Sequence, residues 1–209
     1  MQAVILAGGA GTRLRPLTVN TPKPLVPVGN LPIMEHMIRL LKRHGIKDII
    51  ISLGYLSDKI EQYFGDGSRY GVKLTYSYET TPLGPAGAVR HARGLISGRF
   101  IVASADLLTD INLSHFVAEH QRRGPIASIA LTKSVSPTAF GIVFVNDDGY
   151  ITRFLEKPTW GEVFSDIINA GIYVLEPEIL DLIPEGGEYD FSKDLFPKMA
   201  AENKELFGY

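Results

Sequence analysis

The sequence contains no cysteine, which excludes a disulfide framework, a thiolate nucleophile and a zinc–thiolate site, and fits a reducing compartment. It also has no marked excess of charge, because 21 lysines and arginines face 23 aspartates and glutamates, a formal net charge of −2. Such a protein has no general basic field, and we expect no nucleic-acid partner. Positive charge at any anion-binding site must therefore be local.

Long apolar runs are missing as well. No run approaches the roughly 20 residues that a membrane-spanning helix needs, so we expect no membrane partner. Met1 and Gln2 lead directly into an apolar strand, a beginning unlike a signal peptide. With 209 residues, 45% of them hydrophobic, the chain is long enough for one sizeable core. These properties predict a soluble cytoplasmic protein and leave open whether it is a monomer or a homo-oligomer.

Strand and helix patterns alternate in the first part of the chain. Buried apolar runs and one alternating segment predict strands at 3–7, 48–53, 72–78, 100–105 and 127–132. Amphipathic stretches predict helices at 32–44, 56–64, 85–93 and 113–123. This order is typical of an α/β fold with a mainly parallel, Rossmann-like sheet flanked by helices.

The second part of the chain has a different pattern. Two apolar segments, 141–145 and 150–156, flank an Asn-Asp-Asp-Gly turn and predict an antiparallel hairpin, a small β-rich insertion. A further strand is predicted at 169–175, helices at 178–182 and 191–201, and the start of a strand at 205–209. Because no repeat or linker interrupts the chain, we expect one domain over residues 1–209.

A glycine-rich loop with cations follows the first strand. Gly8, Gly9 and Gly11 have no side chains, so backbone N–H groups there are able to close on a phosphate. Arg13 and Lys23 supply positive charge in the same loop. The sequence lacks both the dinucleotide fingerprint G-x-G-x-x-G and the P-loop G-x-x-x-x-G-K-[ST] at this place. The loop therefore predicts nucleotide chemistry of a different type.

Asp106 is the candidate metal ligand. It follows the predicted strand 100–105, and ligands of open α/β sheets bind beyond the carboxyl ends of strands. A hard cation such as Mg²⁺ takes one or two carboxylates together with phosphate oxygens. The alternative is a capping aspartate in a strand-to-helix loop. We interpret the nearby Asp110 as such a cap, before the helix that starts at Leu113.

Eight segments together resemble the sugar-1-phosphate nucleotidyltransferases, in the family's order and over nearly the whole chain. They are 8–18, 21–28, 79–87 (Glu-Thr-Thr-Pro-Leu-Gly-Pro-Ala-Gly), 104–106, 140–143, 154–158 (Phe-Leu-Glu-Lys-Pro), 168–174 and 191–197. The resemblance implies the fold of nucleotide-diphospho-sugar transferases and transfer of a nucleotidyl group from a nucleoside triphosphate to a sugar 1-phosphate. Both reactants are anions, so charge neutralisation and in-line positioning are the main tasks.

The resemblance also implies roles for individual residues. Catalysis is expected from Arg13, Lys23 and Asp106, with Mg²⁺ on Asp106. Nucleotide binding is expected at Leu6, Ala7, Gly8, Gly9, Gly11, Thr12, Glu79 and Gly84. Sugar-phosphate binding is expected at Gly141, Glu156, Lys157 and Asn169. Simpler interpretations exist for two of them, because Lys157 suits an exposed surface and an asparagine at a strand start often satisfies the backbone. Trp160 is interpreted as a packing residue.

Glu79 favours one base. A carboxylate accepts hydrogen bonds from both N1–H and N2–H₂ of guanine, whereas uracil and thymine present one N3–H between two carbonyls. The resemblance at 79–84 is to the guanylyltransferase form, which favours GTP and, by association, mannose 1-phosphate. Thymidylyl or uridylyl transfer to glucose 1-phosphate is the alternative within the enzyme class. A non-catalytic regulatory subunit that binds a sugar nucleotide is the alternative outside it.

The sequence departs from the family pattern in two places. Ser104-Ala105-Asp106 replaces the commoner Gly-Asp, which is tolerable if Ala105 has negative φ. The family's downstream Gly-Tyr/Phe-Trp-x-Asp segment, whose aspartate is the second metal ligand, does not occur before Tyr209. We therefore expect that the C-terminal part of the domain is missing, and that residues 1–209 alone bind metal weakly and turn over slowly.

Overall fold

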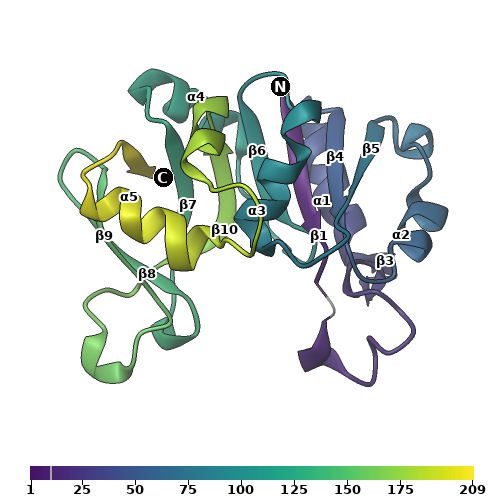
Figure 1. Cartoon of the computed structure of the whole chain (residues 1–209), viewed down its shortest axis with the longest axis horizontal. Coiled ribbons are helices and arrows are strands. Elements are labelled where there is room, and N and C mark those ends of the chain that lie inside the picture. The colour runs from purple at the N-terminus through teal and green to yellow at the C-terminus, as the bar shows by residue number, and fades with distance from the viewer. Residues whose placement is uncertain (10) are drawn as a thin grey trace.

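Parallel strands form the centre of the protein, whose computed structural model describes residues 1–9 and 11–209. β1 (Gln2–Ala7) lies between β4 (Asp48–Leu53) and β6 (Phe100–Ser104), and β5 (Lys73–Tyr78) flanks β4 (Figure 1). All three pairings are parallel, as the alternation of strands and helices predicted. Ala10, inside the glycine-rich loop, lies outside the described residues.

The other half of the sheet contains antiparallel pairings. β10 (Ile167–Leu175) lies between β6 and β7 (Ala127–Lys133) and runs against both. The hairpin of β8 (Gly141–Val145) and β9 (Ile151–Glu156) extends from β10 as the expected β-rich insertion, and β11 (Leu206–Gly208) pairs in parallel with β7. In the described part of the chain the sheet order is β11-β7-β10-β6-β1-β4-β5, with β8 and β9 beside β10. The parallel core is thus confirmed, within a mixed sheet.

Most predicted helices are present with small differences at their ends. The α-helices are α1 (Ile33–Arg43), α2 (Ser57–Phe64), α3 (Gly84–His91), α4 (Leu113–Arg123) and α5 (Phe196–Ala201). The helix predicted at 191–201 is divided, because a π-turn at Phe191–Leu195 precedes α5, and the one at 178–182 is a 3₁₀-helix (Pro177–Leu182). Shorter 3₁₀ turns occur at Thr12–Leu14, Lys23–Leu25, Ser68–Tyr70, Ala92–Leu95, Pro137–Ala139 and Trp160–Glu162, and β2 (Pro27–Val28) pairs with β3 (Leu31–Pro32).

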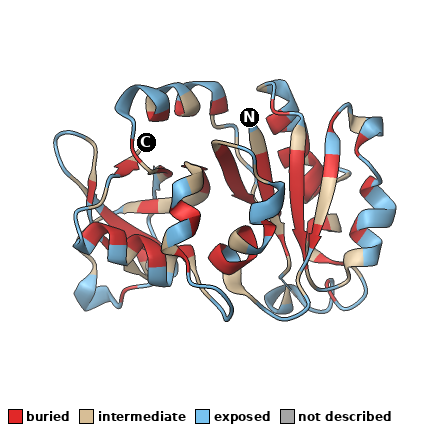
Figure 2. Ribbon diagram, turned by 45° about the horizontal axis from the view of Figure 1, so that its top comes forward, coloured by how far each residue is buried: buried red, intermediate tan, exposed pale blue. Residues whose placement is uncertain are grey.

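Two hydrophobic cores cover the two faces of the central sheet. Successive strand residues point to opposite faces, so Ile5 of β1 packs in the core with α1, α2 and α4. Val4 packs in the other core with α3, the π-turn and α5. The central strands are buried along most of their length (Figure 2). Each buried large apolar side chain stabilises the fold by about 1.5–3 kcal/mol, and together they hold the strand ends in place.

Two local interpretations were wrong. The cap of α4 is Asn112, whose Oδ1 accepts a hydrogen bond from the backbone N–H of His115 at 3.0 Å, rather than Asp110. Asn112 immediately precedes the helix and is therefore the residue whose side chain reaches a free N–H of the first turn. Trp160 is 70% exposed and does not pack in a core. Among the helices of the described residues, none combines the length and apolar character needed to cross a membrane.

Candidate functional site

Predicted site residues gather at the carboxyl edge of the parallel strands. Gly8 follows β1, Glu79 follows β5, and Asp106 lies two residues beyond β6. Leu6 at the end of β1 pairs with Ser104 at the end of β6, so the two strands finish at the same level. Carboxyl ends of parallel strands meet at one edge of a sheet, which is where open α/β folds bind ligands. The structure therefore places these three residues at one candidate site.

Glu79 is held firmly at this edge. Its Oε1 accepts a hydrogen bond from Ser52 Oγ at 2.9 Å, and its Oε2 accepts one from the backbone N–H of Leu83 at 3.3 Å. A Cβ added to Gly8 would lie 2.7 Å from Oε1, so only glycine allows the loop backbone to lie this close to the carboxylate. Each carboxylate oxygen accepts one hydrogen bond from the protein and keeps capacity for another.

The residues around Gly8 differ in burial, because Leu6 and Ala7 belong to β1 and Gly9 lies at the surface. Leu6 and Ala7 close β1, and the carbonyl of Leu6 accepts a hydrogen bond from Ala105 N–H at 2.9 Å, which commits it to the sheet. Gly9 is exposed, and a Cβ added there would meet nothing within 4 Å. Ala105 is not among the described residues with positive φ, so the replacement of the family's glycine there costs no backbone strain.

Gly11 turns the loop back onto Lys23. Its φ of +60° lies in the left-handed region, and its carbonyl accepts a hydrogen bond from the hydroxyl of buried Thr18 at 2.7 Å. A Cβ added to Gly11 would lie 3.2 Å from Cβ of Lys23. Thr12 then begins a 3₁₀ turn that carries Arg13, whose side chain is exposed and has no ion-pair partner among the described residues. The turn thus presents an exposed guanidinium on the same loop as Lys23.

Lys23 and Asp106 form an ion pair between Nζ and Oδ2. The side chains are 30% and 34% exposed, so the pair is partly accessible to solvent. Lys23 comes from the loop after β1, and Asp106 comes from the loop after the neighbouring strand β6. The pair therefore places one cation and one carboxylate side by side at the strand ends.

The donor set at Asp106 is small. Within residues 1–9 and 11–209 no three histidine, aspartate or glutamate side chains cluster as metal ligands do. A site with a single partly exposed carboxylate fits Mg²⁺ only in the mode where phosphate oxygens and waters supply most of its ligands. Asp106 fits that mode, with Lys23 as its present partner.

Gly141 and Glu156 face each other across the β8–β9 hairpin. They are register partners, and a Cβ added to Gly141 would lie 2.8 Å from Glu156 Oε2 and 2.7 Å from the ring of Phe154. A glycine is needed here because the carboxylate and the ring occupy the space that a side chain would fill. Burial raises the pKa of the Glu156 carboxyl group, while the nearby Lys157 ammonium opposes this shift. Glu156 is therefore a half-buried carboxylate on the insertion.

Lys157 has an unusual backbone. Its φ is +46°, and it precedes Pro158, a position in which helical backbone is disfavoured. Its N–H donates to the carbonyl of Phe140 at 2.9 Å, and its Nζ lies 4.0 Å from Glu156 Oε1. Strained residues of this kind often occur at functional sites. The side chain is about half exposed, so the amine is free to meet an anion.

The amide of Asn169 is almost fully used within the protein. Nδ2 donates to Tyr173 Oη and to Ser192 Oγ, both at 3.0 Å, and Oδ1 accepts from Gly171 N–H at 2.8 Å. These bonds span the irregular register of β10 between Asn169 and Tyr173 and tie the strand to the π-turn. Both amide hydrogens are occupied, which favours the simpler interpretation of Asn169 as a residue that satisfies its surroundings.

Gly84 also requires its missing side chain. Its φ is +69°, and a Cβ there would lie 2.7 Å from the carbonyl oxygen of Tyr189. That carbonyl accepts hydrogen bonds from Ala86 N–H at 3.0 Å and Gly87 N–H at 3.1 Å, and Tyr189 N–H donates to Leu83 at 2.8 Å. The first turn of α3 is thereby joined to the segment before the π-turn. Gly84 consequently shapes the wall beside Glu79 through its backbone.

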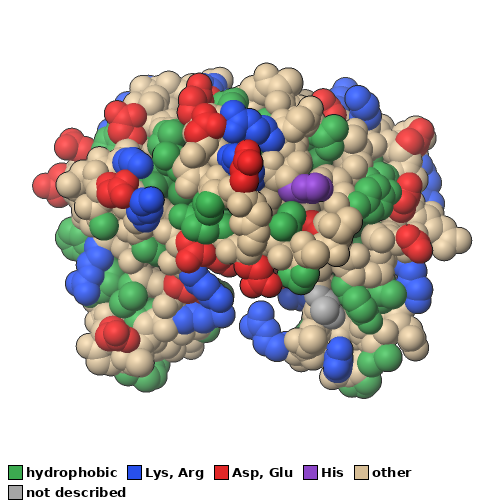
Figure 3. Space-filling model, viewed as in Figure 1, with side chains coloured by type: hydrophobic (Ala, Val, Ile, Leu, Met, Phe, Trp, Pro, Cys, Tyr) green, Lys and Arg blue, Asp and Glu red, His purple; other side chains and the backbone are tan. Residues whose placement is uncertain are grey.

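The two groups of predicted residues lie toward the same edge of the molecule. β10 runs against β6 with Ile172 opposite Ala103, so the residues before Ile172 continue past the carboxyl end of β6. A Cβ added to Gly171 would lie 3.6 Å from the side chain of Leu107, just beyond Asp106. The space-filling view shows a hollow between the β8–β9 lobe and the N-terminal loop, with cationic side chains on both flanks and acidic side chains along its top (Figure 3). This hollow is a suitable place for two anions.

Three functional candidates were not predicted. Ser52 binds Glu79, Thr18 binds Gly11, and a Cβ on Gly54 would lie 2.9 Å from the carbonyl oxygen of Gly8. Ser52 is a polar residue in an otherwise apolar predicted strand, and Gly54 directly follows that strand. Both could therefore have been recognised as site candidates from the sequence. Only the position of Thr18 in the glycine-rich loop could have indicated a role for it.

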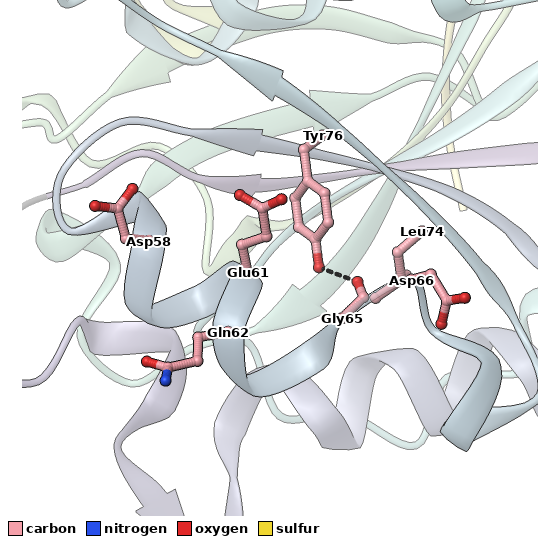
Figure 4. A pocket seen from close by; sticks show the side chains of 7 residues that line it. All are labelled: Asp58, Glu61, Gln62, Gly65, Asp66, Leu74 and Tyr76. Atoms are coloured by element: carbon pink, nitrogen blue, oxygen red, sulfur yellow. Dashed lines mark hydrogen bonds between the residues drawn. The ribbon is translucent and has the colours of Figure 1, made fainter.

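A separate cavity of about 650 Å³ lies between α2 and β5. Its wall includes the carboxylates of Asp58, Glu61 and Asp66, and Tyr76 donates its hydroxyl hydrogen to the carbonyl of Gly65 at 2.6 Å (Figure 4). None of these residues carries a positive charge. An acidic wall repels phosphates, so this cavity is unsuited to the anions that the strand-end site would bind.

Comparisons with known proteins identify the family of this chain. The Nucleotidyl transferase family matches residues 2–208. A UTP–glucose-1-phosphate uridylyltransferase from Synechocystis is 41% identical over 95% of this chain and 55% of its own length. The catalytic subunit beta of mannose-1-phosphate guanylyltransferase from Drosophila pseudoobscura is 39% identical over 99% of this chain and 56% of its own length. The chain thus spans about half the length of the curated relatives it matches.

A solved structure supports the same grouping. HddC from Yersinia pseudotuberculosis, complexed with GMP-PN, superposes with a TM-score of 0.83 at 26% identity, covering 100% of this chain and 89% of that one. By sequence match and by fold, the chain belongs to the Nucleotidyl transferase family.

Proposed function

We propose that this protein transfers a nucleotidyl group from GTP to a sugar 1-phosphate, with mannose 1-phosphate as the favoured sugar. The products are a nucleotide sugar and pyrophosphate. The observation that carries the proposal is that the glycine-rich loop and the Lys23–Asp106 pair lie where the parallel strands end, and that β10 connects this edge to the β8–β9 hairpin, which ends at Glu156. An edge with cations on both flanks suits a reaction between two anions.

The reaction needs little covalent chemistry from the protein. An oxygen of the sugar phosphate attacks the α-phosphorus of the triphosphate, forming one P–O bond while the bond to pyrophosphate breaks. A phosphate monoester is already an anion at neutral pH, so no side chain has to remove a proton from it. In this proposal Arg13 meets the leaving pyrophosphate, Lys23 meets the α-phosphate, and Lys157 meets the sugar phosphate.

Asp106 would hold Mg²⁺ in this proposal. When bound, the ion would neutralise charge on the phosphate oxygens. Lys23 would then exchange its contact with Asp106 for a contact with phosphate, since the carboxylate cannot serve both cations equally. The pair thus keeps the lysine and the carboxylate oriented toward the same place before ligands arrive.

Glu79 supports guanine as the base. Its two oxygens are oriented by Ser52 and Leu83 and keep acceptor capacity, which matches the two donors on one edge of guanine. The HddC structure complexed with GMP-PN is consistent with a guanine nucleotide in this fold. The Synechocystis relative is named for UTP and glucose 1-phosphate, so uridylyl transfer is the second candidate.

Pyrophosphate release measured over a matrix of substrates tests the proposal. GTP, ATP, UTP and dTTP are each combined with mannose, glucose and N-acetylglucosamine 1-phosphates, with Mg²⁺ and with excess EDTA. We expect release with GTP and mannose 1-phosphate in Mg²⁺ and none in EDTA. Because residues 1–209 alone are expected to turn over slowly, the matrix is measured on this chain and on a C-terminally extended one. Preference for UTP and glucose 1-phosphate would establish the second candidate, and nucleotide binding with no release by either protein would favour a regulatory role.

A further inference from the structure

Ser52 is a buried hydroxyl in an apolar strand. It is 1% exposed, and its neighbours Ile51 and Leu53 in β4 are fully buried. A buried hydroxyl requires a hydrogen-bond partner, and Ser52 finds it in Glu79 Oε1 at 2.9 Å. An alanine would fill the same place in the strand without this requirement. The serine therefore acts on Glu79 more than on the packing of the sheet.

The two oxygens of Glu79 have different partners. The backbone N–H of Leu83 only donates, so the side-chain atom of residue 79 that it contacts must be an acceptor, as Oε2 is. The hydroxyl of Ser52 either donates or accepts, so it suits a carboxylate oxygen or an amide nitrogen at the other position. Together the two hydrogen bonds favour one orientation of the carboxylate plane, because other orientations would break at least one of them.

We propose that Ser52 is a positioning residue for base selection, which orients Glu79 so that both carboxylate oxygens face the donors of the nucleotide base. The inference rests on the proposed function, in which Glu79 contacts the base. A carboxylate free to rotate would present its acceptors less often in the arrangement that guanine needs. Ser52 thus contributes to the preference between bases without touching the nucleotide.

The same two hydrogen bonds predict how an amide at position 79 would change the preferred base. In Glu79→Gln, Leu83 N–H would retain the amide oxygen on its side, and Ser52 Oγ would accept a hydrogen bond from the amide nitrogen on the other. The side chain would then present one donor and one acceptor in a fixed order, complementary to N3–H and a carbonyl of uracil. With Ser52 present, residue 79 therefore decides the base.

Ser77 provides a matched control. It is the register partner of Ser52 on the adjacent strand β5 and is also buried, at 7% exposure. Among the described residues its hydroxyl makes no hydrogen bond to Glu79. A change at Ser77 removes a buried hydroxyl from the same face of the sheet and leaves Glu79 with both of its partners.

The test compares wild type with Ser52→Ala, Ser52→Thr and Ser77→Ala. The first readout is the ratio of kcat/KM for GTP to that for UTP at a fixed sugar 1-phosphate. The second is the dissociation constant for UTP divided by that for GTP, from displacement of a fluorescent GTP analogue. Each ratio is independent of the fraction of folded protein. We expect Ser52→Ala to reduce both ratios about tenfold, the scale of a hydrogen bond to a charged group, while Ser77→Ala changes them less than twofold and Ser52→Thr restores them.

The outcomes separate the two proposals. If the wild type prefers GTP and Ser52→Ala has the same ratios as the wild type, the role of Ser52 is overturned. The proposed function then stays in place. Selective nucleotide binding without transfer to any sugar 1-phosphate, by this chain and by a C-terminally extended one, overturns the proposed function, while the binding ratio still decides the role of Ser52. Equal binding of GTP and UTP by the wild type overturns both the guanine assignment and the role of Ser52.

Discussion

Lys23 and Asp106 lie 83 positions apart in the sequence and form an ion pair at the carboxyl edge of the central strands. Lys23 comes from the loop after β1, and Asp106 lies two residues beyond β6, so the pair depends on the parallel neighbourhood of these two strands. Partial exposure limits its contribution to stability, since solvent screens such pairs. Its importance lies in holding a cation and a carboxylate where two anionic substrates would meet.

Replacement of Lys23 tests the cation. We expect Lys23→Met to lower kcat/KM at least about 100-fold, the scale on which loss of a group that stabilises transition-state charge is felt. Lys73→Met is the control, because Lys73 is exposed at the opposite end of β5 and should leave turnover unchanged. A Lys23→Met enzyme within threefold of wild type would contradict the proposed contact with phosphate.

Replacement of Asp106 tests the metal. Asp106→Asn removes the carboxylate charge that a divalent cation prefers, so we expect at least about tenfold weaker Mn²⁺ binding, measured by electron paramagnetic resonance with nucleotide present. Removal of metal from the wild type with EDTA should abolish turnover, and added Mg²⁺ should restore it. Asp110→Asn, a change in an exposed residue of the following loop, is the comparison and should bind Mn²⁺ as the wild type does. Equal Mn²⁺ affinity in wild type and Asp106→Asn would exclude Asp106 as the ligand.

The close approach of Gly8 to Glu79 predicts that the single methyl group added in Gly8→Ala strongly lowers nucleotide affinity. A Cβ at Gly8 would lie 2.7 Å from Glu79 Oε1 and 3.6 Å from Gly54 N, so Gly8→Ala must displace the carboxylate or the loop. We expect nucleotide affinity to fall at least about tenfold, measured by calorimetry with GTP. Gly94→Ala has no neighbour within 4 Å and should bind GTP normally. Unchanged affinity in Gly8→Ala would show that the loop does not approach the nucleotide.

Burial of Glu156 has a consequence for stability. Its pKa is raised in the folded protein, so the folded state binds a proton more readily than the unfolded one. This contribution favours the folded state fully below the ordinary pKa of a glutamate and is lost as pH rises through the folded value. We therefore expect Glu156→Gln to raise the melting temperature at pH 8 by about 1–3 °C, and the gain to disappear near pH 4. The measurement is calorimetric melting at both pH values, and a gain equal at the two would contradict the assignment.

The bonds of Asn169 predict a cost that is structural. Asn169→Leu removes the amide that donates to the buried hydroxyl of Tyr173, so we expect a loss of about 1–3 kcal/mol in unfolding free energy. In the Asn169→Leu background, Tyr173→Phe should cost much less than in the wild type, because the partner is already gone. Urea denaturation of the four proteins in this cycle gives the coupling. Additive effects of the two changes would show that the hydrogen bond contributes nothing.

Local patterns were sufficient for most elements of the fold. β4, α4 and β8 have their predicted bounds, because continuous apolar runs, amphipathic spacing and an Asn-Asp-Asp-Gly turn are properties of neighbouring residues. The same holds for the glycine-rich loop, since positive φ at Gly11 is an intrinsic freedom of glycine. Asp110 shows the limit of this reasoning, because a cap depends on which residue directly precedes the first turn, and Asn112 is closer.

Tertiary structure decided what the polar residues contact. No local pattern places β10 between β6 and β7, since that pairing joins segments far apart in the chain. The hydrogen bond from Ser52 to Glu79 depends on the same kind of pairing, between β4 and β5, and so does the ion pair of Lys23 with Asp106. The sequence alone therefore determined the elements and the kinds of side chain at their ends, because these depend on neighbours along the chain. Which of those side chains meet was decided by strand order and register, because hydrogen bonds and ion pairs act only over a few ångströms in space.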